Sequence, residues 1–498
     1  MSNIKAVDFA KTVEQQRQRL IQHIKDNNIT VSDTASLPAV VGINNNINDP
    51  VTVSGFRVEY VDIDNTPLKT EYVEAGHAST PPATPSYDST LLEFDHWAVS
   101  AGDDLNNITR DTFVLPYYRP KLDPNLNQRP TYLICHFATD LSPTLQIGNT
   151  HTNAYVLWGD GSTAEQITGS TISHTYAEEG WYTITIYGDN YTLGGNSNYG
   201  MFTTSSAAAS LYAVYCGENL NSTTKKLPSN FANQSSNLHI CIFDKDMTDI
   251  STTNGTTFRY CTALLNIVIP SGVTSIPAVF MPSAASKYVV LPNTITSLED
   301  RCFGQNGYNT YIENIVLPDS ITSITSSQGS IFYANPILKN INFPSRVTYV
   351  PSSFVMSCGK LWENKSVVIP STLSFSTNSF SYTGAKEFIL TNPNVAMNCT
   401  GNNLSSVILP SDYNADISIG SLGYVISEEC VIQIANKLKD NTGEGSHTIT
   451  LPTVKLFEYR YLLMLDANGD KVPAGTAGAV SLEQFIKNKN WTVTYSTY

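Results

Sequence analysis

The segment Ile267-Val268-Ile269-Pro270 recurs with small changes through the second half of the chain. Its copies are Val289-Val290-Leu291-Pro292, Ile315-Val316-Leu317-Pro318, Ile341-Asn342-Phe343-Pro344 and Val367-Val368-Ile369-Pro370, with later, more divergent copies at Phe388–Thr391 and Val407–Pro410. The first five prolines are separated by 22, 26, 26 and 26 residues. A period in this range predicts a solenoid, in which stacked copies share a continuous core that one copy cannot form alone.

A second pattern follows each proline: an apolar residue three positions on, another apolar residue three positions later, and then a phenylalanine. The sets are Val273, Ile276 and Phe280; Ile295, Leu298 and Phe303; Ile321, Ile324 and Phe332; Val347, Val350 and Phe354; and, less regularly, Leu373, Phe375 and Phe380. Because proline cannot donate to a strand ladder, we expect each copy to form two short strands joined at its proline. The phenylalanine should point inward and fill the space between successive turns.

These two patterns together resemble the BspA-type leucine-rich repeat, which is found in surface and adhesion proteins of bacteria and some protists. The alternative is an ordinary β-sandwich in which the prolines are spaced by chance. Four intervals that agree closely argue against that alternative.

The composition is typical of a β-rich extracellular or virion protein. Of the 498 residues 41% are apolar and only 14% are charged, and the length suggests three or four domains. The formal net charge is −14 and there is no run of Lys and Arg, which argues against a nucleic-acid or anionic-membrane partner, because both need a basic face. No stretch approaches the run of about 20 apolar residues that a membrane helix requires, so no membrane insertion is expected.

The eight cysteines are spread along the chain, and none forms a C-x-x-C pair. They are Cys135, Cys216, Cys241, Cys261, Cys302, Cys358, Cys399 and Cys430. Several occupy apolar positions within the repeats, as in Arg301-Cys302-Phe303. We therefore expect them to be small buried hydrophobic residues rather than a disulfide framework or a zinc site.

Residues 1–48 are expected to form a helix followed by a linker. Apolar residues over 3–28 alternate steps of four and three, as in a coiled-coil seam, although Arg17 falls within that seam. Two interpretations stay open: a helix that docks on or oligomerises with other chains, a trimer being favoured, and an amphipathic helix packed on its own chain. No secretory signal is recognised at this end.

Residues 49–120 are predicted to form a small β domain. Val58–Ile63 and Leu68–Val73 should pair as a hairpin, with Phe94 and Trp97 in an aromatic core. The order of these features resembles the Listeria–Bacteroides repeat of the internalin B type, which implies a β-grasp-like extracellular module. An unrelated small β domain is the alternative.

Residues 130–205 should form a sandwich. Trp158-Gly159-Asp160-Gly161 predicts a strand end with a buried Trp followed by a tight turn, in which Asp160 bonds its own backbone. Thr183–Tyr187 alternates as a half-buried strand does. Together with His174-Thr175-Tyr176, these residues resemble a PKD-type immunoglobulin-like domain.

The solenoid is expected over residues 215–425, with a degenerate entry repeat, and a small α/β C-terminal cap over 426–498. Ser427 suits the N-cap of a helix that runs to Leu438. A strand at Thr448–Leu451, a helix at Leu482–Asn488 and a last strand at 491–495 should follow. This end either consists of closing repeats that seal the solenoid or is a separate α/β tip domain. The expected fold class is therefore mainly β and multidomain.

No catalytic, cofactor-binding or metal-binding residues are assigned from the sequence, and no cofactor is expected. The eight His are scattered without close ligand spacing. Asp466-x-Asn468-x-Asp470 begins like a calcium loop, but Lys471 stands where that loop needs Gly, so a plain turn is expected. Another acidic cluster is expected to be a solvated loop; it comprises Asp244, Asp246 and Asp249.

We interpret the chain as a non-enzymatic structural component of a bacteriophage virion, such as a head or tail fibre. Three extracellular module types are strung together with no recognised export signal, and a phage leaves its host by lysis. The N-terminal helix would bind other virion proteins, and the repeats would attach to a host-surface protein or glycan, since Tyr and Asn favour such recognition. The alternatives are a BspA-like adhesin on a bacterial cell surface and an enzyme acting on glycans.

Overall fold

The computed structural model describes residues 55–100, 103–194, 198–227, 230–250, 257–304, 310–324, 330–376, 378–399, 404–420 and 426–496. These residues divide into two compact units. The first comprises 55–87, Trp97–Val99 and Asp103–Pro116, and the second comprises the remaining residues. The expected N-terminal helix, with its predicted role in docking and trimer formation, lies outside the described residues.

The first unit is built on a four-stranded sheet in the order β2-β1-β4-β3. Its strands are β1 (Phe56–Val61), β2 (Pro67–Val73), β3 (Leu92–Val99) and β4 (Thr112–Pro120); β3 and β4 continue into the second unit. The antiparallel β1–β2 pairing confirms the predicted hairpin. β4 runs parallel to β1, and Trp97 packs edge-on against the buried Tyr60 at 5.3 Å between ring centroids.

The second unit begins with the predicted sandwich. Its strands are β5 (Thr131–Phe137), β6 (Thr144–Gln146), β7 (Tyr155–Leu157), β8 (Glu165–Gln166), β9 (Thr171–Ser173) and β10 (Gly180–Tyr187). β10 pairs antiparallel with both β5 and β7, while β6 pairs with β9 in a separate small sheet. Trp158 is fully buried, as predicted, and its carbonyl oxygen accepts a hydrogen bond from the Tyr176 hydroxyl at 2.9 Å.

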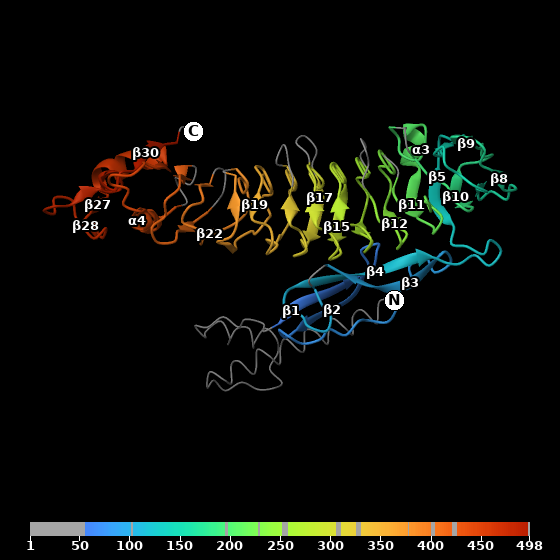
Figure 1. The fold of residues 1–498 in the computed structure, drawn as a ribbon, viewed down its shortest axis with the longest axis horizontal. Coiled ribbons are helices and arrows are strands. Elements are labelled where there is room, and N and C mark those ends of the chain that lie inside the picture. Colours follow the sequence, from blue (N-terminus) through green and yellow to red (C-terminus); the bar gives the residue numbers. More distant parts are fainter. Residues whose placement is uncertain are drawn as a thin grey trace. The chain divides into compact units, whose positions relative to one another are not determined.

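The sandwich and the repeats share one continuous sheet. After α3 (Ser205–Ala209), β11 (Leu211–Tyr215) pairs antiparallel with β5 and parallel with β12 (Ile240–Ile242). A single nine-stranded sheet therefore runs in the order β17-β15-β13-β12-β11-β5-β10-β7-β8, and Figure 1 shows its strands side by side, passing from cyan to yellow. The edge that the first repeat would otherwise expose is covered by the sandwich.

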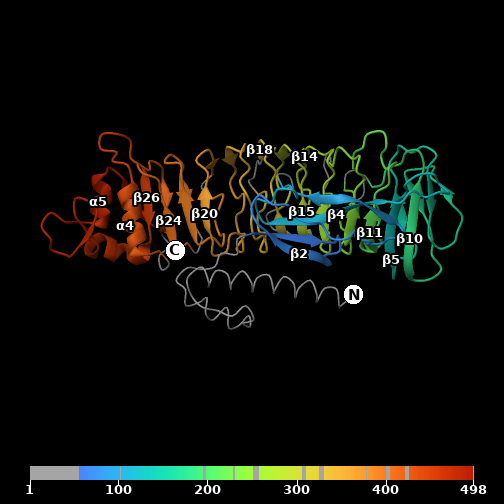
Figure 2. The same cartoon turned by 90° about the horizontal axis from the view of Figure 1, so that it is seen from below.

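Most repeats contribute a strand to each of two parallel ladders, and each ladder is divided into separate sheets; the repeat at 341–344 forms no strand before its proline. The first ladder holds β12, β13 (Asn266–Val268), β15 (Ala285–Val290), β17 (Tyr311–Ile315), β20 (Ser366–Ile369), β22 (Glu387–Leu390) and β24 (Ser406–Ile408). The second holds β14 (Ser275–Ile276), β16 (Ser297–Leu298), β18 (Ser323–Ile324), β19 (Tyr349–Val350), β21 (Ser374–Phe375), β23 (Met397–Asn398) and β25 (Ile417–Ser418). In Figure 2, β14 and β18 lie along one long edge of this unit.

The repeated proline marks the corner between the two ladders. Its carbonyl oxygen accepts a hydrogen bond from the backbone N–H three residues on, for example Val273 to Pro270 at 3.1 Å and Val347 to Pro344 at 3.0 Å. That turn explains the apolar residue three positions after each proline, because the turn ends by directing this side chain into the core. The predicted arrangement of two strands joined at a proline is confirmed at Pro270, Pro292, Pro318 and Pro370, whereas the copy ending at Pro344 forms only the second strand.

A stack of phenylalanine rings runs through the core between successive repeats. Its members are Phe231, Phe258, Phe280, Phe303, Phe332 and Phe354, with ring centroids 5.4–6.5 Å apart. All are at most 1% exposed. The predicted inward direction of the repeat phenylalanines is confirmed, and the stack reaches back to Phe231, before the first regular repeat. The eight cysteines are also buried, as predicted.

The C-terminal region continues the second ladder, which runs β23-β25-β26-β30. Its elements are α4 (Glu428–Lys437), β26 (Thr448–Leu451), the 3₁₀ turn η2 (Thr453–Lys455), the π-helical turn η3 (Glu458–Leu462), β27 (Met464–Leu465), β28 (Lys471–Val472), β29 (Val480–Ser481), α5 (Leu482–Asn488) and β30 (Thr492–Tyr495). Ser427 caps α4 by accepting a hydrogen bond from the Cys430 N–H, as predicted. β26 pairs with β25 and β30 pairs with β26, so strand pairing joins these elements to the repeats, while both interpretations of this end stay predictions.

The chain is mainly β and multidomain, as the sequence predicts. The internalin-type and PKD-type assignments stay predictions. Within the described ranges, no helix combines the length and apolar character that crossing a bilayer requires.

Candidate functional surface

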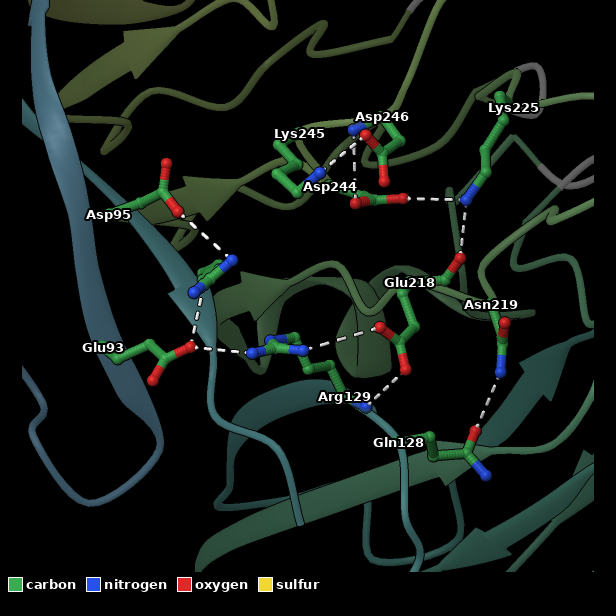
Figure 3. Close-up of polar contacts among 11 residues, drawn as sticks. Glu93, Asp95, Gln128, Arg129, Glu218, Asn219, Lys225, Asp244, Lys245 and Asp246 are labelled. Atoms are coloured by element: carbon green, nitrogen blue, oxygen red, sulfur yellow. Dashed lines mark hydrogen bonds and ion pairs between the residues drawn. The ribbon is translucent and has the colours of Figure 1, made fainter.

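A network of polar side chains connects the segments that lead into the repeat region (Figure 3). Glu93 accepts hydrogen bonds from Arg119 at 2.8 Å and from Arg129 at 2.9 Å. The backbone N–H of Arg129 donates to the Glu218 carboxylate at 3.0 Å. The hydrogen bond from Arg129 is the main cause of a lowered pKa at Glu93. Because these carboxylates are engaged with guanidinium and backbone donors, the network is suited to holding loops together.

The acidic cluster beside this network differs from the sequence prediction. Asp244 is buried rather than solvated, and it accepts from the Lys225 ammonium at 3.1 Å. Asp246 pairs with Lys245 at 2.8 Å, and Asp249 pairs with Lys226 at 3.2 Å. The prediction of a solvated loop was therefore wrong for Asp244, because Lys225, which is distant in the sequence, supplies a cation next to it.

Asp160 lies in the predicted turn. Its carboxylate accepts a hydrogen bond from the Ser162 N–H at 3.0 Å, and its second oxygen lies 2.7 Å from His174 Nε2. The interactions with Ser162 are the main cause of the lowered pKa of Asp160. The His174 ring stacks on Trp158 at 4.8 Å, so the pair is part of the sandwich packing.

The calcium-like segment is a hairpin turn between β27 and β28. The Asp466 carboxylate accepts from the N–H groups of Asn468 at 2.9 Å and Asp470 at 3.0 Å. These bonds close the turn that the sequence predicts, and the expectation that it binds no calcium stays a prediction. Among the residues that the structure describes, no three or more His, Cys, Asp or Glu side chains gather as a metal site would require.

The outer face of the first ladder carries an exposed aliphatic row. In β20, β22 and β24 the buried side chains are Val367 and Ile369, Phe388 and Leu390, and Val407. Their neighbours alternate to the other face. Val368 is 56% exposed, Ile408 is 42% exposed and Ile389 is half-buried. The register pairs Val368 with Ile389 and Ile389 with Ile408, so the three side chains are adjacent.

A charged pocket of about 590 Å³ lies in the same part of the repeat region. Its lining includes Lys339, Lys360 and Lys365, with Asn340 and the 37%-exposed Ile337. Lys339 pairs with Glu313, and Lys360 pairs with Glu363 at 2.8 Å. The Lys365 ammonium instead donates to the Asn340 side-chain oxygen at 2.7 Å.

A second exposed apolar group lies around η3 at the C-terminal end. Phe457, Tyr461 and Leu462 are each more than half exposed, and Val454 is 39% exposed. The rings of Phe457 and Tyr461 are 5.3 Å apart. Residues three and four apart on a helical turn share a face, so these side chains form one apolar patch.

Comparison with known proteins identifies the repeat region. Residues 218–307, 251–386 and 307–415 match the BspA type leucine rich repeat region in six copies. No curated protein matches the chain.

Among solved structures, the chain is similar to a leucine rich cell surface protein from Faecalibacterium prausnitzii A2-165. The identity is 17%, and the match covers 58% of this chain and 74% of that one, with a TM-score of 0.27. A TM-score this low supports no conclusion about the fold or the function of this chain. The sequence match together with the two observed ladders shows that residues 218–415 form a BspA-type leucine-rich repeat region.

Proposed function

We propose that this chain is a non-enzymatic adhesion protein that acts at a bacterial cell surface and binds a host-surface protein or glycan through its repeat region. The observation that carries the proposal is the match of residues 218–415 to BspA-type repeats, which resemble those of surface and adhesion proteins. The exposed aliphatic row and the pocket beside it support the proposal, since exposed apolar groups rimmed by polar residues are typical of interaction sites.

The polar clusters offer little support for an enzyme. Glu93 and Asp244 are held by cationic side chains, and Asp160 is bonded to Ser162 in its own turn and to His174, whose ring stacks on Trp158. A general acid or base needs a group that can exchange a proton with substrate at the working pH. A binding role therefore fits these residues better than a hydrolytic one.

The virion component predicted from the sequence is the second candidate. It requires the N-terminal helix to dock on other virion proteins or to form a trimer. The repeat-family match favours the cell-surface alternative, because the resemblance of these repeats is to surface and adhesion proteins. The mass of the chain in solution, measured with and without residues 1–48, tests whether the N-terminal segment forms a trimer.

Location is tested in the source organism. Surface-exposed protein should be removed by protease treatment of intact cells and recovered in the envelope fraction. Recovery of the chain in purified phage particles, and its absence from the envelope fraction, would instead establish the virion role.

Adhesion is tested with the fluorescently labelled full chain on epithelial cells and on an array of host and bacterial glycans. We expect saturable binding without release of reducing sugar. Turnover of a bound polysaccharide would overturn the non-enzymatic assignment, and absence of binding to every surface would overturn the adhesion proposal.

A further inference from the structure

The charged pocket of about 590 Å³ lies where the first ladder is interrupted. β17 is the last strand of the nine-stranded sheet and β20 is the first strand of the next sheet, while the repeat between them forms no strand before Pro344. That repeat meets β17 through an isolated bridge between Asn314 and Asn340, and through a hydrogen bond from the Lys339 N–H to the Glu313 carbonyl oxygen at 3.1 Å. The pocket thus arises from a local departure from the repeat, and its volume is within the range of about 300–1,000 Å³ that is typical of ligand pockets.

The lining of this pocket offers both hydrogen-bond donors and hydrogen-bond acceptors. Its polar side chains are Glu313, Lys339, Asn340, Lys360, Glu363 and Lys365. Each lysine bonds one oxygen of the other three side chains, and since an ammonium group has three N–H donors, each lysine keeps donors to spare. Within the described part of the chain, the second carboxylate oxygens of Glu313 and Glu363 and the amide nitrogen of Asn340 form no hydrogen bond with the protein.

The charges of the lining restrict the class of ligand. Its three lysines and two glutamates nearly cancel and leave a formal charge of +1. An anionic ligand would lie beside two carboxylates, and a cationic ligand would lie beside three ammonium groups. A wholly apolar ligand would remove these charges from water without replacing their hydrogen bonds, which is costly. A hydroxyl group meets none of these objections, because it is uncharged and both donates and accepts hydrogen bonds.

We infer that this pocket binds a neutral glycan, whose hydroxyl groups donate to the two glutamates and accept from the lysines and the Asn340 amide. The inference rests on the proposed adhesive function and names the ligand class for it. Ile337, which is 37% exposed in the lining, supplies an apolar contact for the C–H groups of a sugar ring. In ligand pockets such apolar side chains provide contact area, while a few polar groups fix the orientation of the ligand.

The test places the full chain on an array of neutral oligosaccharides built from glucose, galactose, mannose, fucose and N-acetylglucosamine, together with sialylated and sulfated counterparts of the same backbones. We expect saturable retention of at least one neutral oligosaccharide and weaker retention of its charged counterparts. Isothermal calorimetry then measures the affinity for that neutral oligosaccharide at low and high sodium chloride. Because the ligand carries no charge, its affinity should change little between the two conditions.

Two variants test the pocket itself. Glu363→Ala removes a carboxylate acceptor and should weaken binding of the neutral oligosaccharide about tenfold, and Ile337→Trp should abolish binding because the larger side chain occupies the opening. Glu444→Ala is the control for the first variant, since this exposed glutamate also pairs with a lysine. Ile408→Trp is the control for the second, since it adds the same ring outside the lining. All four side chains are exposed, so each variant should keep the circular dichroism and thermal unfolding of the parent chain, and both controls should bind as the parent does.

The inference is overturned if the parent chain retains no neutral oligosaccharide, if the charged counterparts bind more tightly, or if either Glu363→Ala or Ile337→Trp binds as the parent does. Adhesion to epithelial cells distinguishes this failure from that of the proposed function. A parent chain that adheres to cells but retains no neutral oligosaccharide would leave adhesion standing without this ligand class, whereas a parent chain that adheres to nothing would remove the proposed function itself.

Discussion

At the scale of single residues, the phenylalanine stack carries much of the packing between repeats. Phe303 contacts Phe280 on one side and Phe332 on the other, with ring centroids 6.4 and 5.4 Å away. Each ring thus belongs to two interfaces at once, and stability in a solenoid depends on such nearest-neighbour contacts.

Phe303→Ala should therefore lower the free energy of unfolding by about 3–5 kcal/mol, through lost burial and the cavity that remains. Urea denaturation followed by circular dichroism measures the change. Phe457→Ala is the control, because this side chain is 64% exposed and should shift stability by no more than about 0.5 kcal/mol. Equal effects of the two substitutions would contradict the stack as a stabilising element.

Glu483 is a buried carboxylate at the start of α5 that is held by three donors. Burial by itself raises its pKa, but hydrogen bonds from Arg460 at 2.7 Å, Lys487 at 2.6 Å and Tyr495 at 2.8 Å outweigh burial and lower the pKa to about 2. The usual Glu pKa is about 4.3. The folded state thus binds the proton less readily than the unfolded state does.

The stabilisation from Glu483 should be fully present above a pH of about 4.3 and lost as the pH falls towards about 2. Glu483→Gln should lower stability at neutral pH by about 1–3 kcal/mol, since it leaves the three donors poorly paired. It should also flatten the acid limb of the stability profile, measured as thermal unfolding against pH. Glu444→Gln, on the exposed turn before β26, should leave that limb unchanged.

The buried thiols give a test of the core that is independent of unfolding energies. Burial raises the pKa of Cys358 and of Cys399 to about 12, and only a thiolate reacts readily.

Iodoacetamide at neutral pH should therefore label none of the eight cysteines in the folded chain and all of them in urea. Peptide mass spectrometry locates each label. Fast labelling of Cys358 in the folded chain would show that the repeat core is open there.

At the scale of elements, the important junction is the antiparallel pairing of β5 with β11. The sandwich supplies the sheet partner that the first repeat strand needs. The side chains of the two strands also pack against the repeats, because Leu133, Cys135 and Val214 belong to the same hydrophobic core as the repeat residues. The sandwich thus serves as the N-terminal cap of the solenoid.

A chain that begins at residue 210 should expose the β11 edge and aggregate, because an unpaired flat edge recruits other strands. A chain that begins at residue 131 keeps β5 and β10 and should stay monodisperse. Size-exclusion chromatography with light scattering compares the two. A monodisperse shorter chain would show that the repeats cap themselves.

At the scale of the whole molecule, the repeats form a stack closed by the sandwich at one end and by α4, α5 and β30 at the other. Stability in such a stack comes mainly from contacts between neighbours, while function depends on side chains that those contacts leave exposed. The side chains of the aliphatic row on β20, β22 and β24 and those of the apolar patch at η3 are exposed in this way. The proposed adhesion therefore does not require a cavity with catalytic groups.

The sequence by itself determined the repeat region and the C-terminal elements, because their signals are local. The proline turn needs only three residues, the core positions follow from the repeat period, and the Ser427 cap and the Asp466 turn are bonded within a few residues. The first assignment of Asp244 to a solvated loop failed because its partner, Lys225, lies in another repeat.

Only the tertiary structure decided which distant segments meet. The pairing of β5 with β11 depends on an antiparallel register that no local pattern encodes. The adjacency of Val368, Ile389 and Ile408 depends on two repeats that are shorter than the 26-residue repeats before them and still bring these side chains to the same level of the ladder. When the repeats stack, residues that are distant in the sequence become neighbours on adjacent strands. The length of each repeat, rather than its sequence motif, decides which side chains lie side by side.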